Sequence, residues 1–549
     1  MQSSRTCNCK QELAVPRATS KGCPSWASLN AFLSANLLAA ILVLFSDCAA
    51  FSSALKEGPD SQNSQSNAET KKSDSDTLRQ TAMEYAEACN FDHARAKLEE
   101  DISLNQSTDK NRLPESWILL GNVYRLEGLY SEARTWISRG VTALEKHNSS
   151  DAQRLSAAYN YLALFNNSAG EFAESEKNAR KALSLSMDSG LGKENQAMHR
   201  VVLANALRQQ GKYREALVEL ETALPILKTG SEKRLLATAT NNLGALYFWM
   251  GDYQKALPIL QDGLKQRLEI CGENHPDVAN SYLDLGCVEY KLGDLKASLE
   301  HLEDAHEIRM SKLGANHPET LSSAANLAVV LLSTGNSRQA LELLKGAVET
   351  GKIVLGNKNP DLAQYKDDYA NALCADKQFD LARDVQTDAN FIRKVAFGPG
   401  SREYASGLRS LAQIESASGN KKAGRQLLQR AIAIYNASPQ QPDPDLGDTL
   451  DELAFMYAES NELESARQTF VLAIREKLKT GNGVSYATSL ANLSELLHRM
   501  NQEAESRVML KKAADAIEAM PEALRGNPDC KAILERYQKA QNGSPAGDH

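Results

Sequence analysis

The sequence of 549 residues has little that would favour β-structure: Phe, Trp and Tyr together make up 6%, and there are only 16 prolines. Strands are enriched in aromatic and β-branched residues. Alanine and leucine, which favour helices, are instead abundant along the whole chain. The composition therefore argues against a β-sandwich and favours an all-α protein. The length is too great for one ordinary compact core and predicts several domains or a repeat array.

An excess of positive charge is also missing. Lys and Arg number 62 against 70 Asp and Glu, which gives a net charge of −8. Because nucleic-acid binding relies on a basic surface, the sequence argues against DNA or RNA as the main partner. The nine cysteines include no CxxC pair, which argues against a zinc site and against a dense disulfide scaffold.

The chain lacks the short motifs that carry common catalytic and nucleotide-binding chemistry. It contains no GxSxG or HExxH, and no GxGxxG in a strand context. The segment SGLGK at 189–193 suggests a phosphate-binding loop, but Met187 stands where that motif requires its first glycine. We therefore predict that the protein is not an enzyme and that it uses no metal and no cofactor.

Residues 1–54 have the layout of a secretory signal. Basic residues precede an uncharged run of 18 residues from Leu29 to Ser46, and mostly small residues follow. This order predicts a signal peptide cleaved after Ala50 or Ala54, or else a retained single-pass membrane anchor, since 18 residues approach the spanning length. In both cases the basic flank stays inside. The rest of the chain is then expected in the periplasm or outside the cell, with this segment as its only membrane contact.

The remaining chain divides into a linker, a long array and a short end. Residues 55–76 are polar and poor in apolar side chains, so we expect a disordered linker. The array is expected over 77–520. Within 521–549 we expect a capping helix at 532–540 and a loose tail.

From residue 77 onward the sequence repeats itself with a period near 42 residues. A small residue recurs at spacings of 39, 42, 41, 40, 42, 42, 42, 42, 42 and 40, namely at Ala82, Gly121, Ala163, Ala204, Gly244, Gly286, Ala328, Ala370, Ala412, Ala454 and Ser494. Chance does not produce such spacing. Each unit is therefore one supersecondary element that stacks on its neighbours.

The positions within each unit predict a pair of antiparallel helices. Seven residues after most of the small residues lies a Gly or Asn, which closes the first helix in a left-handed cap; Lys377 is an exception. Another small residue, 12 positions after the first, lets the two helices approach closely. Because one pair cannot bury its apolar face alone, we predict an α-solenoid of about eleven helical hairpins over residues 77–520.

This pattern resembles the tetratricopeptide repeat, whose small, turn and alanine positions have the same offsets. The usual period is about 34, so each helix here is expected to be about one turn longer. The loops GENHPDVA, GANHPETL and GNKNPDLA, which begin at residues 272, 314 and 356, resemble those of kinesin light chains. The resemblance implies a right-handed superhelix and a mode of binding, without a motor function. His275 and His317 recur in these loops, which favours a role in the turn over metal binding.

The resemblance also implies that the first helix of each hairpin lines a concave groove. Mapping the family's groove offsets onto this chain gives candidate partner-binding residues, namely Asn241, Asn242, Phe248, Trp249, Asp284, Tyr290, Asn326, Asp367, Asp368, Asn371 and Arg409. Asparagine amides can pair with both groups of a peptide backbone, and the three aromatic residues would form an apolar anchor. The acids would favour basic segments, so acidic C-termini are not predicted as ligands.

Two functions are compatible with such an array. The first is a non-enzymatic scaffold, exported or tethered to a membrane, that binds peptide segments of partner proteins in the concave groove. The alternative is a structural spacer or self-assembly element at the cell surface that has no defined peptide ligand. The identity of a partner does not follow from the sequence.

Overall fold

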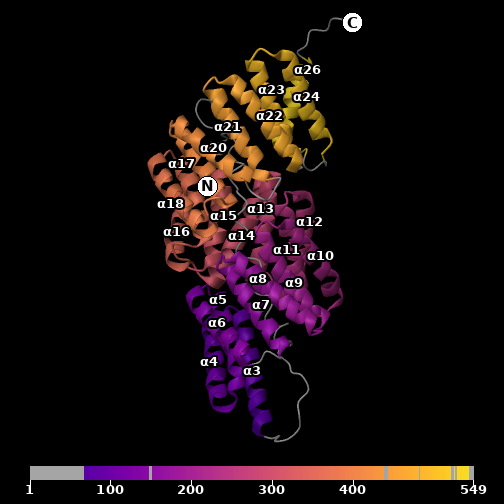
Figure 1. Ribbon diagram of the computed structural model, residues 1–549, viewed down its shortest axis with the longest axis vertical. Coiled ribbons are helices and arrows are strands. Elements are labelled where there is room, and N and C mark those ends of the chain that lie inside the picture. Colours follow the sequence, from indigo (N-terminus) through magenta and orange to yellow (C-terminus); the bar gives the residue numbers. More distant parts are fainter. Residues whose placement is uncertain are drawn as a thin grey trace, which may run out of the picture.

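The computed structural model describes residues 67–147, 151–437, 443–480, 483–520, 525 and 528–542. Within these residues the regular secondary structure is entirely helical, as the composition predicts. The helices run from the N-terminal end, indigo in Figure 1, to the C-terminal end, yellow, in one continuous superhelical stack. The all-α solenoid that the repeat predicts is therefore confirmed.

The helices pair into eleven antiparallel hairpins in the described part of the chain. The first helices of the pairs are α3 (Asn67–Glu87), α5 (Leu113–Leu126), α7 (Ala152–Ser168), α9 (Lys193–Gln209), α11 (Lys233–Trp249), α13 (Pro276–Leu292), α15 (Pro318–Ser333), α17 (Pro360–Ala375), α19 (Arg402–Ala417), α21 (Pro444–Glu459) and α23 (Gly483–Arg499). The second helices are α4 (Phe91–Thr108), α6 (Tyr130–His147), α8 (Phe172–Asp188), α10 (Tyr213–Thr229), α12 (Tyr253–Cys271), α14 (Leu295–Leu313), α16 (Ser337–Val354), α18 (Phe379–Phe397), α20 (Lys421–Ala437), α22 (Leu463–Thr480) and α24 (Glu503–Glu518). A 3₁₀ turn, η1 (Lys110–Arg112), precedes α5, and α26 (Pro528–Asn542) closes the array.

Every hairpin turn contains one residue in the left-handed backbone region, at the position the repeat predicts. Seven of these residues are glycines, and Cys89, Lys377, Asn461 and Asn501 fill the position in the other hairpins with φ between 58° and 64°. Lys377 therefore adopts the same conformation as the glycines although it departs from the pattern. A residue with a side chain is less stable than glycine in this conformation. The packing of the two helices therefore imposes the turn geometry on these four residues.

The two helices of a hairpin approach closely because the recurring small residues face each other. A methyl group on Gly244 would lie 2.6 Å from the Leu260 Cγ atom of the partner helix. Where the second small residue is serine, its hydroxyl donates to a carbonyl of the first helix, as from Ser298 Oγ to Gly286 O at 2.7 Å. Close packing thus holds each hairpin, and a buried hydrogen bond is added where serine takes this position.

The loops between hairpins place one capping side chain before each of five successive first helices. His275 Nδ1, His317 Nδ1, Asn359 Oδ1, Ser401 Oγ and Asp443 Oδ1 each accept a hydrogen bond from a backbone N–H in the first turn of the following helix. These caps satisfy donors that a helix start leaves free. The predicted turn role of the two loop histidines is confirmed.

The two histidines also join successive turns of the superhelix. His275 Nε2 contacts the carbonyl of Glu87 at 3.2 Å, and His317 Nε2 contacts the carbonyl of Leu126 at 2.8 Å, across 188 and 191 residues respectively. We call these contacts, with the packing of Gly128 against Pro318 and of Gly170 against Pro360, the inter-turn seam. Each hairpin turn in the seam meets the loop five hairpins later, so one superhelical turn takes five hairpins.

The seam predicts an acid sensitivity that depends on His317. Burial lowers the pKa of His317 from its usual 6.5 to about 4, so the folded protein keeps this ring neutral where the unfolded chain would be protonated. The stability that the neutral ring contributes is complete above pH 6.5 and is lost as the pH falls to about 4, up to about 3 kcal/mol. His317→Asn keeps a capping group, as Asn359 shows at the equivalent position. It removes the contact to Leu126 O.

We expect the wild type to lose more stability than His317→Asn when urea unfolding at pH 4.5 is compared with pH 7.5. Glu319 and Arg309, the charged groups near this ring, are the same in both proteins and cancel in the difference. An equal loss in the two proteins would show that His317 does not couple the seam to pH.

The two ends of the array differ from the predicted boundaries. The helix α3 begins at Asn67, so residues 67–76 are helical although the sequence predicts a linker up to residue 76. At the other end, α26 contains the predicted capping helix and packs through Cys530 and Ile533 on α23 and α24. None of the described helices is both long and apolar enough to cross a membrane. The predicted signal or anchor at 1–54 lies outside the described residues.

Candidate functional site on the concave face

The first helices form the inner face of the superhelix. Most consecutive first helices, such as α7 and α9 or α15 and α17, lie in direct contact, whereas consecutive second helices lie further apart. The side with the tighter spacing is the concave side. The predicted placement of the first helices along a concave face therefore agrees with the structure.

Asn241 and Asp284 come together as a pair that joins two hairpins. Both side chains are buried, and Asn241 Nδ2 donates to Asp284 Oδ2 while Asn241 Oδ1 accepts from Ser281 Oγ at 3.1 Å. Burial raises the pKa of Asp284 to about 6. The pair fills its own hydrogen-bonding capacity, so we assign it to packing between α11 and α13 and no longer to peptide binding.

The predicted acids of α17 are not free to attract a basic segment. Asp367 is 1% exposed and pairs with Arg393 Nη1 at 2.7 Å. Asp368 accepts from Gln364 Nε2 at 3.2 Å, and burial raises its pKa well above the usual value, which favours the uncharged form of this carboxyl group. The predicted preference for basic ligands rested on the negative charges of these two residues, and they no longer support it.

Three further predicted residues are used within the array. Tyr290 OH lies 2.8 Å from Ser333 Oγ, and Asn326 Nδ2 donates to Ser322 O at 2.9 Å. Arg409 Nη2 lies 2.6 Å from Glu452 Oε1, and this carboxylate raises the pKa of the guanidinium despite burial. All three side chains are buried. Tyr290 joins α13 to α15 and Arg409 joins α19 to α21, whereas the bond of Asn326 lies within α15.

Four predicted residues keep unused binding capacity or contact area. Asn242 is 1% exposed, yet neither its Oδ1 nor its Nδ2 atom has a partner. Asn371 Oδ1 and Trp249 Nε1 are also buried without a partner. The ring of Phe248 lies edge-on to Trp249 with 5.8 Å between centroids, and both pack against the cluster that contains Tyr290. The three aromatic residues predicted as an anchor therefore lie in one hydrophobic cluster.

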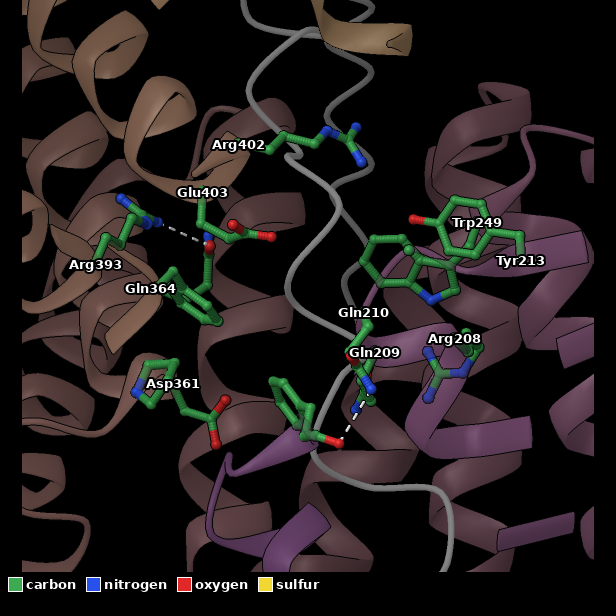
Figure 2. A pocket seen from close by; sticks show the side chains of 14 residues that line it. Arg208, Gln209, Gln210, Tyr213, Trp249, Asp361, Gln364, Arg393, Arg402 and Glu403 are labelled. Carbon is green, nitrogen blue, oxygen red and sulfur yellow. Dashed lines mark hydrogen bonds between the residues drawn. The ribbon is translucent and has the colours of Figure 1, made fainter. Parts of the chain in front are cut away.

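A pocket opens between two successive turns of the superhelix beside Trp249 (Figure 2). It encloses about 660 Å³, part of it open to solvent, and we call it the inter-turn pocket. One wall comes from the ends of α9 and α11 and the turn after α9, and the other from α17, α18 and the start of α19. The lining residues are Phe172, Arg208, Gln209, Gln210, Gly211, Tyr213, Trp249, Pro360, Asp361, Gln364, Arg393, Phe397, Arg402 and Glu403.

Of the residues that line this pocket, the sequence-based mapping gave only Trp249, and Arg208 is among those that it missed. Its position in α9 has the same offset from the repeat's small residue as Phe248 and Tyr290 have in their hairpins. The side chain is 3% exposed, and its Nη2 atom donates to Asn205 Oδ1 at 2.7 Å. The repeat offset could have indicated this residue, but its hydrogen bonding is visible only in three dimensions.

Cys271, His275 and Asp277 gather within 4.8 Å of one another in a group that resembles a metal site. A guanidinium already occupies the centre of this group, because Arg234 Nη2 lies 3.4 Å from both Cys271 Sγ and His275 Nε2. Its Nε atom lies 3.7 Å from Asp277. The positive charge of Arg234 would repel a cation, so we interpret the cluster as part of the seam. The five cysteines in the described residues are free thiols.

Residues 154–229, 235–311 and 288–353 match the sequence profile of the tetratricopeptide repeat. The first two matched stretches coincide with pairs of hairpins, α7 to α10 and α11 to α14, and the third runs from the end of α13 through α16. Within these matched stretches the chain carries tetratricopeptide repeats. The profile covers the middle of the array, and the same left-handed turns extend this repeat to the hairpins on either side.

Solved structures with tetratricopeptide-like repeats resemble parts of the chain, whereas no curated protein matches it. Repeats of a putative kinesin light chain from Podosopora anserina share 22% identity, cover 37% of this chain and 96% of that chain, and give a TM-score of 0.32. BtubC (BKLC) from P. vanneervenii shares 18% identity, with 43% and 94% covered and a TM-score of 0.34. A Rap protein complexed with competence and sporulation factor shares 14%, with 75% and 99% covered and a TM-score of 0.46. Nothing about binding follows for this chain from likenesses of this size.

Proposed function

We propose that the protein is a non-enzymatic scaffold that binds an extended peptide segment of a partner protein on its concave face. The observation that carries this proposal is Asn242, whose buried amide has neither a donor nor an acceptor partner. A buried polar group without a partner costs about 1–3 kcal/mol. Beside an aromatic anchor, such an amide fits a peptide backbone, which offers one donor and one acceptor per residue.

Two neighbouring first helices extend this row of free amide donors. Asn160 in α7 and Asn205 in α9 are both 1% exposed, and each uses its Oδ1 atom while its Nδ2 atom has no partner. The donors thus come from three consecutive hairpins. An extended segment laid across the first helices would present carbonyl oxygens to them in succession, with Trp249 and Phe248 beside it.

One further point supports a scaffold without enzymatic activity, and another supports its location outside the cytoplasm. Tetratricopeptide repeats are generally non-enzymatic interaction modules. The apolar run Leu29–Ser46 with its basic flank supports export of the repeats, or their anchorage to a membrane. Fractionation of expressing cells with an antibody against the array tests this location. Recovery of the protein with the cytosol would contradict it.

Binding is tested by offering the immobilised full chain a synthetic library of random octapeptides and measuring the affinities of the retained peptides. We expect the double variant Asn242→Ala/Trp249→Ala to bind these peptides at least tenfold more weakly, because it removes the free amide and the aromatic anchor. Its helicity should stay unchanged. The control Asn357→Ala/Phe391→Ala removes an asparagine and an aromatic residue at exposed positions.

Three results would contradict the proposal. The wild type could retain no peptide, or the concave variant could bind as tightly as the control variant. Loss of helicity in the concave variant would show that Asn242 and Trp249 hold the fold. A spacer without a peptide ligand would then be the better account of the array.

A further inference from the structure

Three arginines on the inside of the superhelix are paired with carboxylates, whereas Arg208 is not. Arg393, Arg402 and Arg409 each lie within 2.7 Å of an aspartate or glutamate oxygen. Arg208 has no carboxylate within ion-pair distance among the residues that the structure describes, and its Nε and Nη1 atoms have no hydrogen-bond partner. A buried and unpaired guanidinium is costly, which makes it a candidate for ligand binding.

The lack of partners is particular to this residue and does not come from the local motif. Arg125 occupies the same offset in α5, and it too follows an asparagine three positions earlier. Its Nε and Nη2 atoms both donate to Asn122 Oδ1, at 2.9 and 2.7 Å, and its Nη1 atom donates to Ser168 Oγ at 3.4 Å. In α9 the same pair leaves two guanidinium nitrogens without acceptors, and this guanidinium lines the inter-turn pocket (Figure 2).

The unpartnered buried atoms of the neighbouring side chains are also N–H donors. Gln209 Nε2 and Trp249 Nε1 line the same pocket, and neither has an acceptor. The wall formed by α9 and α11 therefore combines a positive charge with donors that lack acceptors. Burial lowers the pKa of Arg208 to about 10, so the guanidinium stays charged at neutral pH. An ionised carboxylate is the common peptide group that has negative charge and only acceptors.

We infer that Arg208 binds a carboxylate of the peptide in the inter-turn pocket, either the C-terminal carboxylate or the side chain of an Asp or Glu. This inference rests on the proposed peptide-binding function and specifies the chemistry of the ligand. It reverses the expectation from the sequence, which gave the groove a preference for basic segments. The opposite wall carries Asp361 and Glu403, which would repel a carboxylate, and its two arginines, Arg393 and Arg402, are already paired with Asp367 and Asp445. This charge arrangement places the carboxylate on the side of Arg208.

The test uses two octapeptide libraries of the same composition, one with free C-terminal carboxylates and one with C-terminal amides, each offered to the full chain. For a retained peptide, single carboxylates are then neutralised by amidation or by Asp→Asn and Glu→Gln exchange. We expect one of these changes to weaken binding to the wild type at least tenfold. The change that does so identifies the terminus or a side chain as the source of the carboxylate.

The matched variants are Arg208→Gln and Arg214→Gln, the second at an exposed arginine six positions further along. We expect Arg208→Gln to bind the original peptide at least tenfold more weakly and to respond less than twofold to neutralisation of that carboxylate. Arg214→Gln should behave as the wild type. This double-mutant comparison separates a direct pairing from a general loss of binding.

Two results would overturn the carboxylate inference and leave the scaffold function intact. In the first, no neutralisation changes the affinity of the retained peptides for the wild type. In the second, Arg208→Gln and Arg214→Gln bind these peptides equally tightly. A wild type that retains no peptide from either library would overturn both. If Arg208→Gln loses helicity, the neutralised peptides on the wild type still decide the question, because they need no change in the protein.

Discussion

Replacing Asp367 by alanine is expected to destabilise the array by about 3–5 kcal/mol, because it leaves a buried charge without its partner. Arg393 is 2% exposed, and its pairing with Asp367 Oδ1 at 2.7 Å joins α18 to α17. The same carboxylate accepts hydrogen bonds from Gln386 in α18 and, at 3.2 Å, from Ser410 in α19. Three helices of two hairpins therefore lose a common acceptor.

The effect is measured by hydrogen exchange and denaturant unfolding, with Asp380→Ala as the control. Asp380 lies in α18 and pairs with Arg383 at 2.8 Å, but it is fully exposed, so its loss should change the stability little. Faster exchange in Asp367→Ala should concentrate in α17, α18 and α19, since repeat arrays unfold locally. If the two variants are equally stable, Asp367 is not a structural centre, and its sequence-based assignment to peptide binding regains support.

The second large effect is expected at Gly128, where the hairpin turn after α5 meets the loop before α15. Its φ of +82° suits glycine, and an alanine methyl group would lie 2.5 Å from Pro318 Cδ in the next superhelical turn. Gly128→Ala therefore combines backbone strain of about 1–2 kcal/mol with a clash across the seam that costs about 1–3 kcal/mol more.

Gly251 provides the control that separates these two contributions. Its φ of +80° is nearly the same, but a methyl group there would meet nothing within 4 Å. We expect Gly251→Ala to show only the backbone strain in thermal unfolding. Gly128→Ala should be less stable than this control and should have a larger radius of gyration by small-angle X-ray scattering. Indistinguishable stability and scattering in the two variants would show that the seam does not hold the superhelical turns together.

The hairpins could be predicted from the sequence because each is determined by local packing. The small residue, the turn residue seven positions later and the second small residue lie within one hairpin, so their spacing in the sequence reflects one contact in space. Lys377 shows how strongly this geometry acts, since it takes a φ of 64° where the pattern lacks glycine. The capping role of His275 followed from the same local logic.

The pairing of side chains on the concave face could not be predicted in this way. The repeat offsets place Asn241 and Asp284 on the same face, but whether they meet depends on how one hairpin rotates against the next. They do meet, 43 residues apart, whereas Asn242 beside them finds no partner. A periodic pattern thus identifies the face, while the unsatisfied groups on it are found only from the three-dimensional arrangement.

The seam contacts of His275 and His317 join residues that are 188 and 191 positions apart. They depend on the sum of the small rotations between successive hairpins, which no single segment of the sequence determines. For the same reason, the sequence did not show that Arg208 and Asp361 line opposite walls of one pocket. The fold and the concave face could be predicted from the sequence, but the pitch of the superhelix could not. The location of the pocket follows from that pitch.

The seam also changes how the array can respond to the gain or loss of a repeat. In an ordinary solenoid each hairpin touches only its sequence neighbours, so a duplicated unit disturbs two interfaces. Here the turn after α5 is matched to the loop before α15, and the turn after α7 to the loop before α17. One inserted hairpin between them would bring every such turn opposite the wrong loop. The number of hairpins in one superhelical turn is therefore fixed, and we expect evolution by duplication to be limited to changes that preserve this number.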